Sequence, residues 1–397
     1  MLFSVVIPTH NRLHLLRDAI ETVSRQTWRN WELVIFDNAS SDPIGDHIES
    51  LKDQRIRYSR SDNFLPVTDS WNRAISAARG DYVILLGDDD GLIPDYFVKI
   101  KKIIDDFEGP EIIYSAIYQF LHPGVAPWDR DGYVADVKNG FFFSDRRAPF
   151  RLSAEDARRA VVGSLHLRRN FTFNIQAFVF KNEFIARISQ EGPFFRSPFP
   201  DYYLANIALA RASSVVVVPE PLAIAGVSRA SFGFTLFNGE EEKGEALLNA
   251  KLADDPIYRE VEAKLLPGPA YQTNYIVTME YVARATKSFL FENADFDRYR
   301  RLQILTVVRA AQMGLPLGKA WPDLRRRLTG KERVWANLVT AILAAGKRLS
   351  FLESTAVAKL ESSVAPYSFQ PKQRVCDRGH FSRAIEVYEA IEVGVVH

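Results

Sequence analysis

Cysteine and long hydrophobic runs are the features that this sequence has least of. Cys376 is the single cysteine in 397 residues. One cysteine excludes an intrachain disulfide framework and is typical of a reducing compartment. No apolar run approaches the roughly 18 residues that a transmembrane helix needs. The N-terminal run Met1–Pro8 lacks basic residues and is too short for a signal peptide, so the sequence predicts a cytoplasmic protein.

An excess of charge of one sign is also missing. The chain has 50 Lys and Arg against 49 Asp and Glu, a formal net charge of +1. Because this balance gives no global field toward a polyanion, we expect no nucleic acid partner. A phosphate-binding G-x-x-x-x-G-K-[ST] loop, a G-x-G-x-x-G turn and an H-E-x-x-H zinc motif are absent as well. His10 and His14 have no metal-ligand spacing, and we interpret them as structural or loop residues.

The N-terminal half of the chain alternates apolar strands with amphipathic helices. This alternation is typical of an α/β domain built from βαβ units. The expected strands are 3–7, 31–36, 56–58, 83–86, 111–117, 171–180 and 215–218, and the expected helices are 13–23, 71–79, 94–107 and 202–211. Residues 121–170 are aromatic and irregular, which is typical of lids and substrate-binding loops.

The character of the sequence changes near residue 238. From there on the periodicity is helical almost throughout, and strand-like runs are absent. We therefore expect one domain over 1–238 and a helical domain over 239–397. Within the latter, residues 331–343 with Arg325–Arg327 favour an ordinary bundle helix, and a basic amphipathic helix on anionic lipid is the alternative.

The segment Gly80–Pro94 is the most informative one. An apolar strand ends in Asp88, Asp89 and Asp90, and Pro94 then begins a helix. Adjacent acids at the end of a buried strand repel each other unless a cation lies there, and oxygen ligands favour Mg²⁺ or Mn²⁺. A solvated acidic turn is the alternative, and on this segment alone the two weigh evenly.

Polar clusters follow three of the predicted strands. They are Pro8–Arg12, Asp37–Asn38 and Asp88–Asp90. Because ligands of open α/β sheets collect at the carboxyl ends of strands, these clusters predict one site. The parts suit a nucleoside diphosphate: Asp37 could accept the imide N–H of uracil, the first cluster could flank base and ribose, and a cation would neutralise the diphosphate.

These segments in this order resemble the family 2 glycosyltransferases. The resemblance rests on residues 4–12, 26–42 and the acidic segment, is strong over 1–105 and weak over 171–235. It implies a GT-A fold, a Rossmann-like α/β domain with a mixed sheet, followed here by the mostly helical C-terminal region. The nucleotide-sugar half would be about 1–105 and the acceptor half about 106–238. The family inverts the anomeric centre, using a nucleotide-sugar donor and a divalent metal.

The resemblance also implies roles for individual residues. Thr9 and Asp37 would contact the base and ribose, and Asn72 matches an asparagine in the helix before the metal strand, next to Trp71 in place of the commoner basic residue. The donor-binding set that it implies is Pro8, Thr9, Asn11, Arg12, Asp37, Asn38, Asn72 and Asp88. Arg229 and Ser231 occupy a place where the family often contacts the diphosphate.

The metal motif departs from the family pattern. That pattern is Asp-x-Asp-Asp with a proline four residues after the last acid, and counting back from Pro94 puts Gly87 at the first acid. This register makes Asp89 the ligand of Mn²⁺ or Mg²⁺, with Asp90 beside it. Ignoring the register, Asp88-x-Asp90 also satisfies a bare D-x-D.

An inverting transfer needs a general base for the acceptor hydroxyl. In the family this is an acid at the start of a helix, and Asp201 takes that place here, with Pro200 replacing the first acid of the common pair. The alternative is an aspartate that only stabilises the helix N-terminus, and both roles can hold together.

The sequence therefore predicts a metal-dependent inverting glycosyltransferase that moves a sugar from a UDP-sugar to a hydroxyl acceptor. The family suggests a glycan or lipid-linked saccharide of a cell-surface polysaccharide or glycolipid as acceptor. A nucleotidyltransferase is disfavoured because Pro8–Arg12 lacks glycines, and a non-catalytic sugar-binding member of an assembly is the main alternative. The helical region could serve in oligomers, in acceptor binding or in peripheral contact with the inner face of the membrane.

Overall fold

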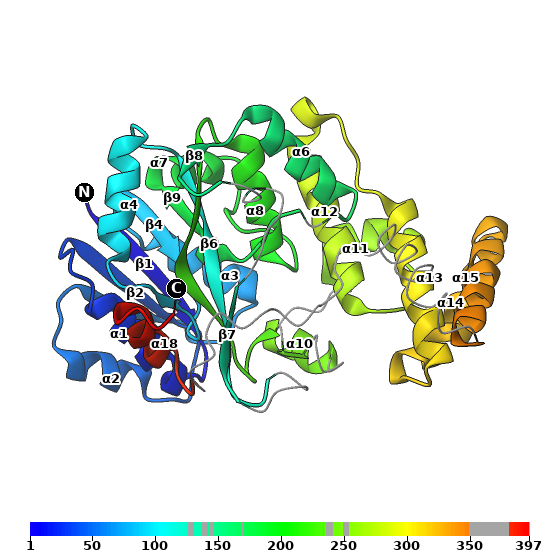
Figure 1. Ribbon diagram of the computed structural model, residues 1–397, viewed down its shortest axis with the longest axis horizontal. Helices are drawn as coiled ribbons and strands as arrows, with labels where there is room; N and C mark the ends of the chain where they lie inside the picture. Colours follow the sequence, from blue (N-terminus) through cyan, green and yellow to red (C-terminus); the bar gives the residue numbers. More distant parts are fainter. Residues whose placement is uncertain are drawn as a thin grey trace.

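A ten-stranded mixed sheet forms the centre of the molecule (Figure 1). The computed structural model describes residues 1–125, 131–136, 142, 146–168, 170–232, 234–235, 241–248, 254–348 and 381–396. The strands are β1 (Phe3–Thr9), β2 (Trp31–Asp37), β3 (Ile56–Arg60), β4 (Tyr82–Leu85), β5 (Gly91–Leu92), β6 (Ile112–Leu121), β7 (Tyr133–Asp136), β8 (Phe150–Arg151), β9 (Phe178–Lys181) and β10 (Val215–Val227).

The strand order is β3-β2-β1-β4-β9-β6-β10-β5, with β7 beside β6 and β8 beside β10. Strands β1 to β4 pair in parallel, and β9 is antiparallel to both of its neighbours. The expected mixed sheet of an α/β domain is therefore confirmed. Its parallel half brings the ends of β1, β2 and β4 to one edge, where Thr9 pairs with Asp37.

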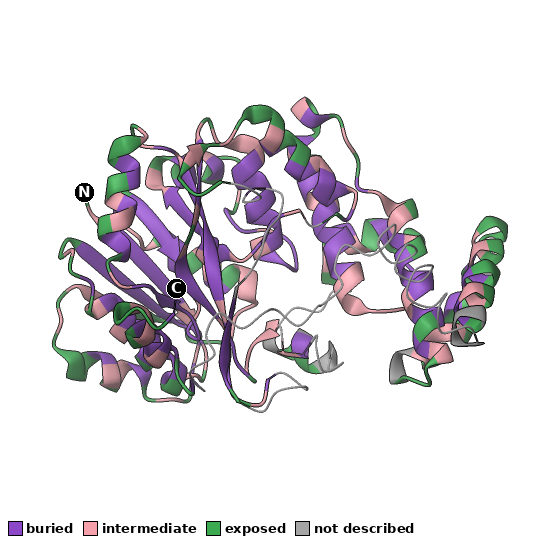
Figure 2. Ribbon diagram, in the orientation of Figure 1, coloured by how far each residue is buried: buried purple, intermediate pink, exposed green. Residues whose placement is uncertain are grey.

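Helices cover both faces of the sheet, so β1, β2 and β4 are almost wholly buried, whereas the edge strand β3 is partly exposed (Figure 2). Alternate residues of β1 belong to different clusters: Val5 and Ile7 pack with α1 and α4, and Val6 packs with α3. The helices are α1 (Leu13–Ser24), α2 (Ile44–Leu51), α3 (Val67–Ser76), α4 (Tyr96–Asp106), α6 (Ala154–Leu165), α7 (Asn182–Ser189), α8 (Pro200–Arg211), α10 (Glu241–Leu248), α11 (Pro256–Val261), α12 (Ala270–Leu290), α13 (Phe296–Gln312), α14 (Trp321–Arg326), α15 (Gly330–Arg348) and α18 (Ala384–Glu392).

The C-terminal helices extend the core away from the sheet. Helix α12 packs against α8 and α6, and α13 and α15 follow outward (Figure 1). The predicted helical region is confirmed, but one hydrophobic cluster includes buried residues of both α8 and α12. The boundary at residue 238 therefore stays a prediction. Among the described residues, no helix is long and apolar enough to cross a membrane.

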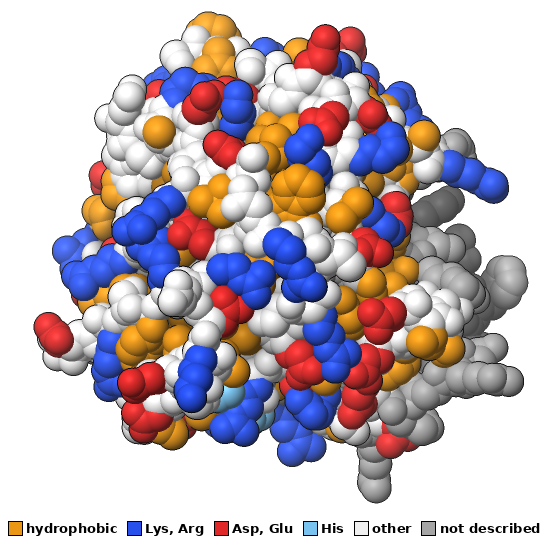
Figure 3. Space-filling model, turned by 90° about the vertical axis from the view of Figure 1, so that its left-hand side faces the viewer, with side chains coloured by type: hydrophobic (Ala, Val, Ile, Leu, Met, Phe, Trp, Pro, Cys, Tyr) orange, Lys and Arg blue, Asp and Glu red, His pale blue; other side chains and the backbone are white. Residues whose placement is uncertain are grey.

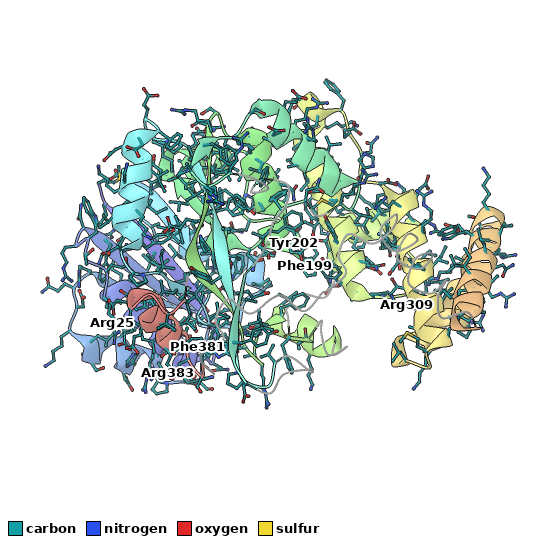
Figure 4. The ribbon with its side chains drawn as sticks, in the orientation of Figure 1. Arg25, Phe199, Tyr202, Arg309, Phe381 and Arg383 are labelled. Atoms are coloured by element: carbon teal, nitrogen blue, oxygen red, sulfur yellow. The ribbon has the colours of Figure 1, made fainter. Side chains whose placement is uncertain are left out.

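The last helix does not join the other C-terminal helices. The sequence predicts residues 381–391 within the helical domain, whereas the structure packs α18 against α1. The buried residues of this segment, Phe381, Ile385 and Tyr388 among them, belong to the cluster of α1 and α4. Two ion pairs hold it, Arg383 with Asp18 and Arg25 with Glu389, and Figure 4 shows the arginines beside α1 and α18.

Three other expectations need correction. Residues 154–165, within the segment expected to be irregular, form α6, whose first turn is capped by Ser153 Oγ accepting from the Asp156 amide at 3.0 Å. The strand expected at 215–218 continues to Val227, because register shifts around Pro221 absorb the prolines. The strand expected at 171–180 covers only 178–181, preceded by a 3₁₀ turn at Ile175–Ala177.

Candidate functional site

The three polar clusters meet at the carboxyl edge of the parallel strands, as the sequence predicts. Asp88 links the first cluster to the third. Its Oδ2 accepts from Thr9 Oγ1 at 2.8 Å, and its Oδ1 accepts from Arg12 Nη1 at 3.1 Å. Arg12 also donates to the carbonyl of Ala230. Burial raises the pKa of Asp88, while the Arg12 charge opposes this rise. Arg12 thus ties the loop after β1 both to Asp88 and to the segment after β10.

Asp90 is bonded at both carboxylate oxygens. Oδ2 accepts from the Gly87 amide at 2.6 Å and from the side chain of Gln176, and Oδ1 accepts from the Gly226 amide at 2.8 Å. A Cβ at residue 87 would lie 2.5 Å from Asp90 Oδ2, so this carboxylate fills the space of a side chain at that position. Burial and the neighbouring Asp89 raise the pKa of Asp90 to about 8.

Asp89 is bonded at one carboxylate oxygen only, as far as the described residues show. Its Oδ2 accepts from Ser228 Oγ at 2.9 Å and from Ser231 Oγ. Its side chain is buried, and β10 passes so closely that a Cβ at Gly226 would lie 1.7 Å from the Asp89 carbonyl oxygen. The two serines and β10 fix the Asp89 carboxylate, and its Oδ1 atom stays available as a ligand for a metal ion.

The acidic cluster offers a divalent metal only part of a coordination shell. Within the described part of the chain, no group of three or more His, Cys, Asp or Glu side chains could hold a metal ion. One free carboxylate oxygen fits instead the way Mg²⁺ binds, through one or two carboxylates plus substrate phosphates. The residues therefore fit a metal that arrives with a phosphorylated ligand.

Asp37 is fully buried, and both of its oxygens have protein partners. Oδ1 accepts from the Ser40 amide at 2.8 Å, and Oδ2 accepts from the Tyr58 hydroxyl at 2.7 Å and Arg60 Nη1 at 2.9 Å. The Arg60 side chain is 46% exposed, so it can turn away into solvent. Next to it, the Asn38 side chain bonds both the amide and the carbonyl of Leu65. Asn38 therefore braces a loop.

Other members of the predicted donor set have structural contacts. Pro8 lies within β1, and the Asn11 side chain accepts from the Ser41 amide at 2.6 Å. Asn72 donates to the Phe195 carbonyl and accepts from its amide, both at 2.9 Å. Asn72 thus ties α3 to the segment that precedes α8.

Asp201 lies in the first turn of α8, where the helix dipole favours a negative charge. It is half-buried, and aromatic rings surround the start of this helix. Phe199 lies 5.0 Å from Tyr202 and 5.2 Å from Phe232, measured between ring centroids, and Figure 4 shows Phe199 and Tyr202 facing α12. Phe232 follows Ser231 directly, so one short segment connects the acidic cluster to the surroundings of Asp201.

A pocket of about 690 Å³ opens beside the first cluster. The His10 ring stacks on Phe64 at 4.2 Å, with His10 Nδ1 bonded to the Asn38 carbonyl. Two basic side chains, Arg229 and Lys243, are also part of the lining. The lining residues are His10, Phe64, Gly124, Arg229, Ala230, Phe234, Thr235, Lys243 and Ala246. An aromatic platform with two cations suits a nucleoside phosphate.

Sequence reasoning does not find Ser228, Gln176, Phe64 or Lys243, and it interprets His10 as structural. One sequence signal could have revealed Ser228: it is a second hydroxyl residue three positions before Ser231. Gln176 and Phe64 come from elements far away in the sequence and carry no local motif. Their roles follow from tertiary packing alone.

Two sequence relatives of this chain are named as glycosyltransferases, in agreement with the resemblance found in the sequence. Residues 4–160 match the model of glycosyl transferase family 2. An uncharacterized glycosyltransferase of Rickettsia felis is 32% identical over 167 residues, 41% of this chain and 26% of the relative. A putative colanic acid biosynthesis glycosyl transferase of Escherichia coli is 35% identical over 96 residues, 24% of this chain and 34% of the relative.

Among solved structures, S. aureus TarS 1–349 in complex with UDP is similar, with 13% identity and a TM-score of 0.47, over 88% of this chain and 92% of that one. The sequence matches span only 26% and 34% of the two curated relatives. The resemblance inferred from the motifs is confirmed over the matched segment. Residues 4–160, which are less than half of this chain, are therefore similar to glycosyl transferase family 2.

Proposed function

We propose that this chain is a metal-dependent, inverting glycosyltransferase that moves a sugar from a UDP-sugar to a hydroxyl acceptor. The observation that carries the proposal is the arrangement of three adjacent carboxylates. Asp88 and Asp90 are bonded at both oxygens, whereas Asp89 keeps Oδ1 free of described partners and is held in place by two serines. Such an arrangement suits a ligand position rather than a solvated turn.

Asp89 would hold Mn²⁺ or Mg²⁺, with Asp90 beside it. When bound, the metal neutralises the charge that develops on the departing diphosphate. Ser228 and Ser231 orient the Asp89 carboxylate, and Arg12 balances the charge of Asp88. Burial and mutual repulsion raise the free energy of adjacent charged carboxylates. A bound divalent ion lowers that free energy, so such a cluster favours metal binding.

The donor would occupy the pocket beside His10 and Phe64. The stacked rings offer a platform for the base, and Arg229 and Lys243 in the pocket lining would supply cations for the phosphates. Asp37 can accept the uracil imide N–H once Arg60 turns into solvent, and Thr9 lies at the adjoining strand end. A carboxylate acceptor suits the imide N–H of uracil, which thymine shares, and the comparison of UDP with dTDP below distinguishes the two bases.

Asp201 would be the general base. It takes the proton of the acceptor hydroxyl while the new glycosidic bond forms and the bond to the diphosphate breaks. Pro200 begins the helix, and Asn72 fixes the preceding segment through Phe195, so the position of Asp201 is well defined. Transfer from the face opposite the diphosphate inverts the anomeric centre.

The acceptor would be a glycan or lipid-linked saccharide of a cell-surface polysaccharide or glycolipid. A relative named for colanic acid biosynthesis and relatives named for PGL/p-HBAD biosynthesis support this class. The cytoplasmic location and the formation of oligomers stay predictions from the sequence.

The test is thermal stabilisation by UDP, GDP, dTDP and CDP, each with Mn²⁺ and with EDTA. We expect UDP to raise the melting temperature only with Mn²⁺, and Asp89→Asn to lose this shift. Asp106→Asn, whose side chain is 51% exposed on α4, is the matched control and keeps it. A flat response to all four nucleotides would favour the non-catalytic alternative.

A further inference from the structure

Helix α15 exposes an apolar face at the end of the molecule farthest from the sheet (Figure 1). Val334 is 70% exposed and Leu338 is 51% exposed. With the exposed Ala341 they follow each other at spacings of four and three, which places them on one side of the helix. The opposite side, with Ala336, Val339 and Leu343, is buried.

Exposed cations surround the beginning of α15. Residues 319–333 contain six basic and two acidic side chains, although the whole chain has a net charge of only +1. Both acids already have basic partners: Asp323 bonds Arg326 at 2.9 Å and Glu332 bonds Arg300 at 2.5 Å. Five exposed cations lie within ten residues of Val334 in the sequence, namely Arg325, Arg326, Arg327, Lys331 and Arg333.

These cations lie where a helix already carries positive charge. Lys331 and Arg333 are in the first turn of α15, at the positive end of its dipole. Cations at this end are unfavourable in isolation, and an anionic partner relieves the repulsion. The sheet side differs, because Lys and Arg are interspersed there with Asp and Glu (Figure 3).

We propose that this basic–apolar surface, formed by Arg325, Arg326, Arg327, Lys331, Arg333, Val334 and Leu338, docks on a bilayer that contains anionic lipid. The cations would contact headgroup phosphates, and Val334 and Leu338 would enter the boundary with the acyl chains. Positive charge beside an exposed apolar helix face is the combination that such binding requires. This proposal is independent of the proposed catalytic function, since none of these residues belongs to the candidate site.

The test is co-sedimentation of the full chain with vesicles. One set contains phosphatidylcholine alone, and the other contains phosphatidylcholine with phosphatidylglycerol. We expect binding to the anionic vesicles only, and we expect it to weaken as salt is added, because salt screens the attraction.

Two variants separate the contributions. Arg325→Gln with Arg327→Gln should weaken binding by about fivefold for each cation removed. Val334→Ser with Leu338→Ser should weaken it at unchanged charge, and both positions are exposed, so the fold is retained. The matched control is Val98→Ser with Lys102→Gln on α4, where these side chains are also exposed and no loss is expected.

Three results would overturn the proposal. Wild type could bind neutral and anionic vesicles equally. The two surface variants could bind as wild type does. Finally, analytical ultracentrifugation could show a dimer that Val334→Ser with Leu338→Ser dissociates, which would assign the face to contact between copies of this chain. Melting temperatures equal to wild type show that each variant is folded.

Discussion

Carboxylates are treated in opposite ways at the two ends of this molecule. At the sheet edge, three adjacent carboxylates lie together, Asp88, Asp89 and Asp90, and Arg12 forms an ion pair with Asp88. The pKa of Asp90 rises to about 8. In the helical end, Glu332 accepts from Arg300 and from Thr329, and its pKa falls to about 2.

The difference separates two uses of buried charge. A carboxylate with a lowered pKa stabilises the fold, because the folded state prefers its charged form. Buried carboxylates with raised pKa values, such as Asp88 and Asp90, cost stability, and a cation from outside reduces that cost. The sheet edge is thus organised for a ligand and the Glu332 pair for structure. The predictions below test this contrast, from the largest expected effect to the smallest.

Asp201→Asn gives the largest expected loss of activity. We expect kcat of sugar transfer to fall by about 10²–10⁴-fold, because the acceptor proton loses its base. Donor binding should not change, since Asp201 lies at the start of α8, outside the lining of the pocket beside His10. Transfer rates together with UDP-dependent melting shifts measure both quantities. Equal kcat in the variant would leave Asp201 as a residue that only stabilises the helix.

Asp89→Ala should strongly reduce metal-dependent transfer while the fold is retained. We expect a loss of about 10²–10³-fold, the size found when a group that stabilises developing charge is removed. Titration with Mn²⁺ followed by the melting temperature measures metal binding separately from turnover. Asp106→Ala on α4 is the matched control. An Asp89→Ala protein with unchanged activity would remove the metal assignment.

Gly226→Ala and Gly330→Ala compare how the sheet edge and the start of α15 tolerate an added methyl group. A Cβ at Gly226 would lie 1.7 Å from the Asp89 carbonyl oxygen, whereas nothing lies within 4 Å of one at Gly330. We expect the first change to lower the free energy of unfolding by about 3 kcal/mol and to weaken Mn²⁺ binding. The second should change stability by less than about 1 kcal/mol. Urea unfolding measures both.

If Gly226→Ala were as stable as Gly330→Ala and bound Mn²⁺ normally, β10 would not hold Asp89 in place. The acidic edge would then be a flexible loop rather than a fixed site. Its contrast with the tightly bonded Glu332 pair would disappear.

The sequence predicts the N-terminal half well because its signals are local. Buried β-branched runs such as Val5–Ile7 and the helix punctuation at Pro94 depend on neighbours in the chain. The convergence of Thr9, Asp37 and Asp88 follows from a general rule about parallel strands, and the contacts confirm it.

The parts that could not be predicted depend on tertiary contacts. The return of α18 to α1 rests on Arg383 meeting Asp18, far apart in the sequence. The same holds for the Ser228 bond to Asp89 and the stacking of His10 on Phe64. No periodicity or spacing reveals such pairs before the chain is folded.

Glu332→Gln tests the structural end of the comparison. Hydrogen bonds from Arg300 and Thr329 lower the pKa of Glu332 from 4.5 to about 2, so the folded state binds this proton less readily than the unfolded state. The stabilisation is therefore complete above pH 4.5 and is lost as the pH falls toward 2. We expect the variant to lose about 2 kcal/mol at pH 7, and the difference from wild type to shrink under acid.

Urea unfolding at several pH values measures this difference. Glu262→Gln, at an exposed position in the same C-terminal helical region, is the matched control and should follow wild type at every pH. A Glu332→Gln protein that follows wild type as well would show that the pair with Arg300 contributes no stability. The two ends of the molecule would then differ only in how many acids they gather, and not in what those acids do for the fold.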